Sequence, residues 1–195
     1  MKLTRALGAT FLFVVLLLAT YYVHIRYFTV NVVFYAAIAD GVIATVLTAI
    51  LISGSHTFNG FEKLLLVVIW LLSGYAFAIS VPTVLDRSLS FYILEKLQQR
   101  GGGIQESRFG DVFTKEYLVE HRLVDVRLTE QMQSGTIVIQ NGCVKLTEKG
   151  QQLATASRYF RQHFLPKRRL LMGQYSSDLT DPFRHSANIS DYKCQ

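Results

Sequence analysis

The sequence predicts a mainly α-helical membrane protein, in which three transmembrane helices precede a small α+β domain with a two-stranded β-hairpin. Three apolar runs, at 6–23, 30–52 and 64–85, are each close to the roughly 20 residues that an α-helix needs to cross about 30 Å of hydrocarbon. Up to residue 85 the only acidic residues are Asp40 and Glu62. The hydrophobic share of 50% and the mean hydropathy of +0.27 are high for an ordinary soluble domain. We therefore predict an anchor at 1–85, a juxtamembrane domain at 86–169 and a tail at 170–195.

The first and third apolar runs each contain a feature that affects their prediction as regular membrane helices. Lys2 and Arg5 precede a leucine-rich stretch, which is also how a cleavable secretory signal begins. The stretch is long and no small-x-small cleavage site comes before His24, so we predict that it is retained as a membrane helix. Near the end of the third run, Pro82 removes a backbone hydrogen bond, and we expect a bend there.

Asp40 lies near the middle of the second run, where an ionised carboxylate costs roughly 2.5 to 3.5 kcal/mol on insertion scales. Either it forms a proton or ion site, or it makes a polar contact within the membrane. The apolar runs contain no basic residue and no second acidic residue that could pair with Asp40. We therefore favour a protonated Asp40 whose hydrogen bonds hold helices together. Gly41 and Gly74 would allow the helices to approach closely. The expected hydrogen-bond partners are Thr45, Ser73, Tyr75 and the backbone.

After residue 86 the pattern becomes that of a soluble domain. Apolar residues at helical spacing predict helices at 88–100, 105–119 and 124–134, and the glycines at 101–103 end the first of them. Residues 136–140 and 143–146 are expected as two strands, because Asn141-Gly142 between them is the strongest two-residue signal for a hairpin turn. Thr147 is a suitable N-cap for a last helix that continues to about residue 164.

Two segments of this domain resemble the winged-helix domains of the MarR-like and PadR-like families. Met132-Gln-Ser-Gly-Thr-Ile137 is similar to the segment in which a glycine closes the recognition helix before the wing. Val144-Lys-Leu-Thr-Glu-Lys-Gly150 is similar to the leucine-threonine-x-x-glycine run that enters the following helix. The resemblance covers about 88–164. It implies a winged-helix fold, with DNA binding as the usual activity of these families.

The local charges favour a protein partner over DNA. The residues that would contact DNA are those of the third helix and the wing: Arg127, Gln131, Asn141, Gly142 and Lys145. A DNA reader needs cations that face phosphates and side chains that reach base edges. On the third helix Asp125 and Glu130 outweigh the single cation, and the wing tip has no arginine.

The positive excess of the domain collects on the last helix and just after it. The cations are Arg158, Arg161, Lys167, Arg168 and Arg169. Such a cluster matches lipid headgroups better than it matches the surface of a recognition helix. We therefore expect membrane lipids to be one partner of this domain.

The number of positive charges differs little between the two sides of the membrane, so these charges only weakly determine on which side the C-terminal domain lies. Lys2, Arg5 and Lys63 would lie on one side, and Arg26, Arg87, Lys96 and Arg100 on the other, which is close to a tie for the positive-inside rule. A winged helix is mostly a cytoplasmic module. We therefore expect a multi-pass protein of a bacterial inner membrane with its C-terminal domain in the cytoplasm.

The sequence does not predict an enzyme. The five histidines are scattered, without a second His or Cys at metal-ligand spacing. The glycines at 101–103 lack a following Lys-Ser/Thr, so they do not form a phosphate-binding loop. We expect no catalytic residue, no cofactor, no metal and no small-molecule substrate. With only two cysteines, Cys143 and Cys194, we expect no disulfide framework.

After Pro166 no helical or strand period persists. The tail at 170–195 is expected either to be disordered or to dock on a partner, and its candidate docking residues are Tyr175, Leu179, Pro182 and Phe183. The function that these observations favour is a noncatalytic accessory or assembly protein, which presents a winged-helix interaction module to a protein partner at the membrane. The alternative is a membrane-tethered winged-helix transcriptional regulator that binds DNA.

Overall fold

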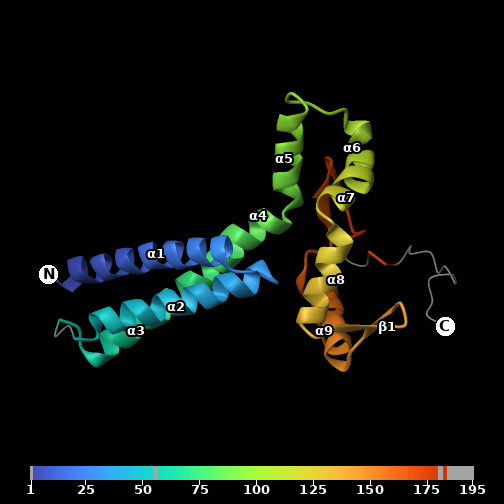
Figure 1. Ribbon diagram of the computed structural model, residues 1–195. Coiled ribbons are helices and arrows are strands. Elements are labelled where there is room, and N and C mark those ends of the chain that lie inside the picture. The colour runs from blue at the N-terminus through green and yellow to red at the C-terminus, as the bar shows by residue number, and fades with distance from the viewer. Residues whose placement is uncertain (1, 55–56, 180–181, 184–195) are drawn as a thin grey trace. The chain divides into compact units, whose positions relative to one another are not determined.

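The computed structural model describes residues 2–54, 57–179 and 182–183, and it is mainly helical, with 72% of its residues in helices. The chain divides into two compact units, residues 1–123 and residues 124–195. Figure 1 shows the long helices α1, α2 and α3 at the N-terminal end of the chain and the helices and strands that follow them. The two units are described one at a time below.

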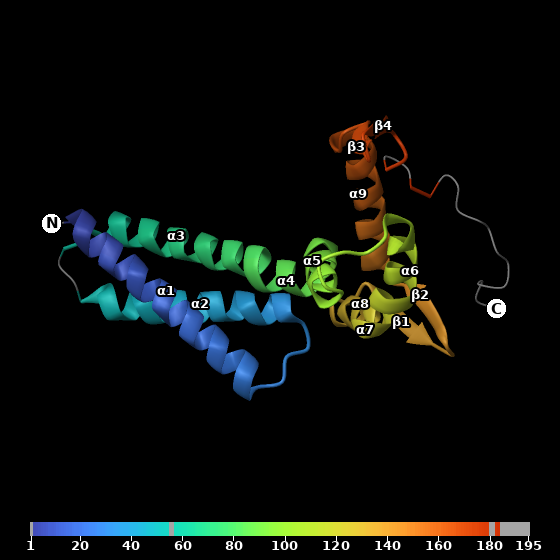
Figure 2. The same cartoon turned by 90° about the horizontal axis from the view of Figure 1, so that it is seen from above.

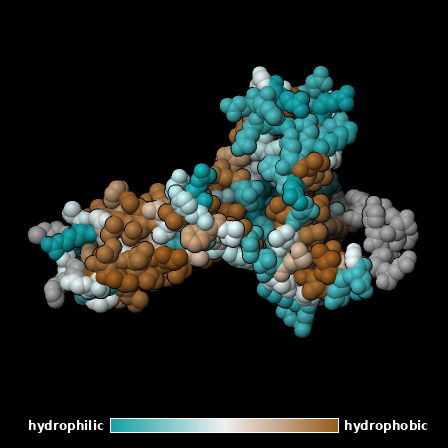
Figure 3. Space-filling model, viewed as in Figure 1, coloured by the Kyte–Doolittle hydropathy of each residue, from teal (hydrophilic) through white to brown (hydrophobic). Residues whose placement is uncertain are grey.

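Three helices of the first unit are long and apolar enough to cross a membrane, which confirms the predicted number of spans. They are α1 (Lys2–Tyr27), α2 (Val33–Ser53) and α3 (Gly60–Ala78), and the third candidate span continues through residue Arg87. Many large hydrophobic side chains of these helices are exposed, and Figure 3 shows hydrophobic residues over most of the face of the bundle that is in view. A surface of this kind is stable in hydrocarbon and not in water, so the chain is a membrane protein.

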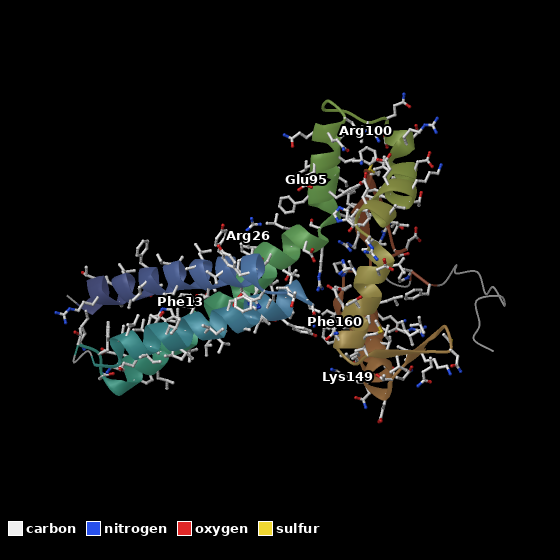
Figure 4. All side chains as sticks on the ribbon, viewed as in Figure 1. Phe13, Arg26, Glu95, Arg100, Lys149 and Phe160 are labelled. Carbon is white, nitrogen blue, oxygen red and sulfur yellow. The ribbon has the colours of Figure 1, made fainter. Side chains whose placement is uncertain are left out.

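Large and small side chains alternate in the contacts between the three helices. Phe13 of α1 stacks on Trp70 of α3 with their ring centroids 5.9 Å apart, and both side chains are buried. Gly41 of α2 meets Gly74 of α3 so closely that a Cβ atom at Gly41 would lie 3.2 Å from the Cα atom of Gly74. The expected close approach at these two glycines is therefore present. Figure 2 shows the three helices side by side, and Figure 4 shows Phe13 within the bundle.

The end of the third span has an irregular helical geometry. A π-helical turn, η1 (Ile79–Thr83), contains the buried Pro82, and the short helix α4 (Val84–Arg87) follows it. A π-turn leaves room for a proline that would otherwise clash with the preceding turn. Ser88 then caps α5 (Leu89–Gln99), because its hydroxyl oxygen accepts a hydrogen bond from the backbone of Phe91.

The next helical run packs against α5 within the first unit. It consists of η2 (Glu106–Arg108), α6 (Phe109–Asp111), η3 (Val112–Tyr117) and α7 (Leu118–Glu120). The sequence predicted one regular helix at 105–119, whereas the structure changes between 3-10, α and π geometry there. Tyr92, Val112 and Tyr117 form the buried core between this run and α5.

The second unit consists of a helix, a hairpin, another helix and a second hairpin. Helix α8 (Leu123–Gln133) leads to β1 (Ile137–Gln140), which pairs antiparallel with β2 (Cys143–Leu146). Asn141 and Gly142 have φ angles of 52° and 74°, as a two-residue hairpin turn requires. Thr147 caps α9 (Glu148–Phe164) by accepting a hydrogen bond from the backbone of Gly150. The predicted hairpin is thus confirmed.

Gly150 occupies a position where no side chain fits. A Cβ atom at Gly150 would overlap the carbonyl oxygen of Thr136 and would lie 3.1 Å from a methyl group of Leu146. The glycine of the leucine-threonine-x-x-glycine run therefore lets the first turn of α9 pack directly on the base of the hairpin. The winged-helix fold as a whole stays a prediction, because residues 89–120 and 124–164 belong to different units.

One expectation for the C-terminal part is wrong. The strands β3 (Arg169–Leu171) and β4 (Gln174–Ser176) pair antiparallel, although the sequence showed no persistent period after Pro166. The expectation for Cys143 and Cys194 depends on Cys194, which lies outside the described residues.

Candidate functional site

Asp40 is buried inside the membrane bundle, with 1% of its surface exposed, and it has a histidine as its partner. The Nδ1 atom of His24 on α1 lies 2.8 Å from Oδ1 of Asp40 on α2. The other carboxyl oxygen, Oδ2, is buried and has no hydrogen-bond partner among the residues that the structure describes. The expectation that Asp40 has no basic companion is therefore wrong.

The expected partners of Asp40 make other contacts. The hydroxyl of Thr45 donates a hydrogen bond of 2.8 Å to the backbone carbonyl of Gly41. Tyr75 is half exposed, and its ring lies edge-on to Phe34 at 6.5 Å between centroids. The stabilising contact of Asp40 thus comes from a neighbouring helix and not from its own helix or from α3.

The connection between α1 and α2 explains why His24 and Asp40 meet. His24 lies close to the end of α1 at Tyr27, and Asp40 lies in the first half of α2, which begins at Val33. Residues 28–32 reverse the chain, so that the end of one helix lies beside the beginning of the next. The sequence contained this signal, since both residues flank one short connection.

The His24–Asp40 pair can hold two helices together in either protonation state. An ionised carboxylate accepts from Nδ1–H, and a protonated carboxyl donates to Nδ1, so one hydrogen bond remains in both cases. The pair lies beside a cavity of about 450 Å³ that is also lined by Ala19, Val23 and Ile43. The pair is therefore a polar clamp between α1 and α2. The second carboxyl oxygen of Asp40, Oδ2, takes no part in this contact.

A second polar cluster joins α5 to the run that ends in α7, outside the candidate spans. We call Tyr92, Lys96, Arg100, Glu116 and Glu120 the Lys96 cluster. The Nζ atom of Lys96 lies 2.8 Å from Glu116 and 2.6 Å from Glu120, although only 5% of the lysine side chain is exposed. Arg100 donates to both oxygens of Glu116 at 3.0 and 3.1 Å, and Figure 4 shows Arg100 near the end of α5.

These contacts shift the ionisation of the cluster toward its charged form. Hydrogen bonds to Glu116 and Glu120 raise the pKa of Lys96 above its ordinary range. The hydrogen bond from Lys96 lowers the pKa of each glutamate. Burial and the hydrogen bond that its hydroxyl donates to Glu120 raise the pKa of Tyr92. The cluster is therefore a charged clasp between two helices.

The residues expected to contact DNA are engaged within the second unit. The guanidinium of Arg127 pairs with Glu130 at 2.9 Å, and Gln131 accepts hydrogen bonds from the Thr136 hydroxyl through its backbone and side-chain oxygens. Asn141 and Gly142 form the hairpin turn, and Lys145 lies exposed opposite Val138. Four of the five candidate positions thus already support the fold of this unit.

The expected lipid-binding cations lie on α9 and on the segment that enters β3. Arg158 is exposed and Arg161 is half-buried on α9, whereas Lys167, Arg168 and Arg169 are exposed and follow one another directly. The candidate docking residues of the tail lie at or after β4. Tyr175 is 65% exposed and Phe183 is 73% exposed, with Leu179 and Pro182 between them.

Comparison with known proteins adds no family. No family model, no curated protein and no solved structure matches this chain. The class of protein is therefore defined by the fold alone. It is a membrane protein with three candidate transmembrane helices and a mainly helical part that carries a β-hairpin.

Proposed function

We propose that the chain is a noncatalytic accessory or assembly protein of the membrane, which presents residues 124–179 to a protein partner. The observation that carries the proposal is the uncovered apolar surface of that segment. Ile137 is its one buried hydrophobic residue among those that the structure describes, whereas large apolar side chains elsewhere in it are exposed. Exposed apolar side chains that gather on one module mark an interaction surface.

The first hairpin shows how this surface is organised. Ile139 and Val144 are directly opposite each other and share one face of the hairpin with Ile137 and Leu146. Ile137 is buried at the base, whereas Ile139 and Val144 near the turn are 44% and 45% exposed. This outer part of the apolar face is free of contacts that would cover it, so it is a suitable place for a partner.

The orientation belongs to the same proposal. We place residues 86–195 in the cytoplasm because Arg87, Lys96 and Arg100 follow the third span. The positive charges on the two sides are close to a tie, so the orientation is a direct test of the proposal.

The test of the interaction uses two matched pairs of substitutions on one hairpin. The tagged full chain is purified in mild detergent, and the proteins that accompany it are quantified. The variant Ile139→Ser/Val144→Ser should lose the partner, and Val138→Ser/Lys145→Ser, on the other face of the same strands, should keep it. Equal recovery with both variants would contradict the proposal. Specific recovery of a DNA fragment that depends on Arg127 would favour the tethered regulator instead.

A further inference from the structure

The second hairpin carries an exposed apolar tip. Its two-residue turn is formed by Met172 and Gly173, with φ angles of 47° and 85°. Met172 is 85% exposed, Leu170 is 59% exposed and Leu171 is 40% exposed. Three consecutive large apolar residues at the end of a hairpin are costly to leave in water.

The hairpin is too small to be stable without a covering surface. Each strand has three residues, and the two strands form a sheet of their own. A single two-stranded hairpin is marginally stable at best in water, and it gains stability when one face packs against something. Leu170 and Tyr175 are directly opposite each other, and both side chains are exposed. The hairpin therefore presents a face that a second surface can cover.

The charges beside the tip identify that surface. Lys167, Arg168 and Arg169 immediately precede the apolar residues, so a block of cations and a block of apolar side chains are adjacent within one short segment. Lysine is depleted at protein interfaces, and three successive cations are unusual in the core of one. By contrast, apolar side chains that enter the headgroup region beside basic residues are the usual combination on proteins that bind anionic bilayers.

The rest of α9 extends the same combination. Phe160 and Phe164 stack with their ring centroids 5.2 Å apart and are 55% and 65% exposed. Arg158 and Arg161 lie on the same last turns of the helix. Because the chain is anchored by its own candidate spans, a bilayer is present at a high effective concentration, and a weak contact is sufficient.

We propose that residues 158–176 are a second membrane contact, in which Leu170, Leu171 and Met172 insert between the headgroups of anionic lipids while Lys167, Arg168 and Arg169 bind the phosphates. The inference extends the expectation from the sequence that the cations of this segment contact membrane lipids. It does not depend on the protein partner or on the first hairpin, so it can fail while the partner remains and hold while the partner is absent.

The test places a reporter at the hairpin tip of the full chain in vesicles. Met172→Trp is reconstituted in phosphatidylcholine alone and in phosphatidylcholine mixed with phosphatidylglycerol, each with lipids brominated in their acyl chains. The signal of Trp70, measured in the chain without the reporter, is subtracted. Gln140→Trp, beside the turn of the first hairpin, is the matched control.

Insertion predicts a blue-shifted emission and strong quenching for the reporter at position 172 in the anionic vesicles only. Most of this quenching should disappear in Lys167→Gln/Arg168→Gln/Arg169→Gln and at high salt, which screens the charges. Equal quenching at positions 140 and 172 would overturn the proposal. So would a blue shift without quenching, which indicates packing against protein, or equal quenching in vesicles without phosphatidylglycerol.

Discussion

At the scale of single residues, Asp40 shows that the partner of a buried polar group determines what that group costs in hydrocarbon. A carboxyl group without a partner in the membrane is expensive. His24 lowers this cost because it forms a hydrogen bond of 2.8 Å with Asp40 from another helix. The same bond connects two helices, so the residue that is hardest to insert also helps to define how the bundle packs.

The first prediction concerns substitutions of Asp40. Asp40→Asn should lower the stability of the bundle less than Asp40→Leu, because Asn keeps an oxygen that can accept from His24. The loss in Asp40→Leu should be on the order of 1 kcal/mol, as for other polar contacts between membrane helices. Thermal unfolding in detergent measures it. Adding His24→Leu to Asp40→Leu should recover part of the loss, because it removes the unpartnered imidazole.

A proton-relay role for Asp40 would give a different pattern. Asp40→Asn would then abolish the function of the chain while its assembly with the partner, its amount and its thermal stability stayed unchanged. That outcome would rule out the clamp as the main role of Asp40, because an amide can replace a hydrogen bond but cannot carry a proton.

Local sequence predicted Asp40 and not its partner, for a physical reason. A carboxyl group in an apolar run is recognisable by its own cost, whereas His24 lies at the edge of a run and looks like an interfacial residue. Their contact depends on how α1 turns into α2, which no spacing within one helix shows. Lys96 is a similar case, because its partners Glu116 and Glu120 lie in the helical run that follows α5 and not in α5 itself.

At the scale of elements, the Lys96 cluster should determine how firmly α5 holds the helical run at 106–120. Two residues of α5 and Arg100 directly after it donate to two glutamates of that run, beside the core of Tyr92, Val112 and Tyr117. Because the apolar core here is small, the charged clasp carries much of the specificity of this contact.

The second prediction concerns the removal of Lys96. Lys96→Met should speed up amide hydrogen exchange throughout 89–120, because it leaves Glu116 and Glu120 without their shared cation. Lys115→Met is the matched control. Lys115 pairs with Asp111 at 2.9 Å, but 73% of its side chain is exposed, so its loss should have little effect. Equal exchange in both variants would show that the clasp is not needed.

The third prediction concerns pH. The pKa values of Glu116 and Glu120 are lowered below the ordinary 4.5, so their contribution to stability is present above pH 4.5 and disappears as the pH falls through the lowered values. The pKa of Lys96 is raised above the ordinary 10.5, so its contribution is present below pH 10.5 and disappears as the pH rises through the raised value. Thermal unfolding should therefore show a plateau between these limits in the wild-type chain, with smaller losses on either side in Lys96→Met.

The helices and strands that have a local sequence signal were predicted, and those without one were not. The three spans, the hairpin around Asn141-Gly142 and α9 after Thr147 follow from composition, turn chemistry and capping, and the structure contains all of them. The second hairpin was missed because its turn begins with Met172, which is not a typical residue at a positive φ angle. The π-helical geometry at 112–117 has no such local signal.

At the scale of the whole molecule, the side of the membrane on which residues 86–195 lie is the fourth prediction. A fusion of green fluorescent protein after residue 195 should fluoresce in bacteria, because this protein folds in the cytoplasm and not after export through the general secretory route. A fusion of alkaline phosphatase at the same place should be inactive. The opposite result would reverse the proposed orientation.

The π-helical turn at 79–83 has a consequence for the phase of the helix that contains it. An α-helix rotates by about 100° per residue, and a π-turn contains one residue more than an α-turn. Residues Ile79–Thr83 therefore act as a one-residue insertion, and the side chains of Val84–Arg87 point about 100° away from where the stripe of α3 would have placed them. Deleting one residue from this segment would leave the bundle contacts of α3 intact and rotate everything that follows about the helix axis. The number of residues in this segment thus sets the direction in which the chain leaves the third span.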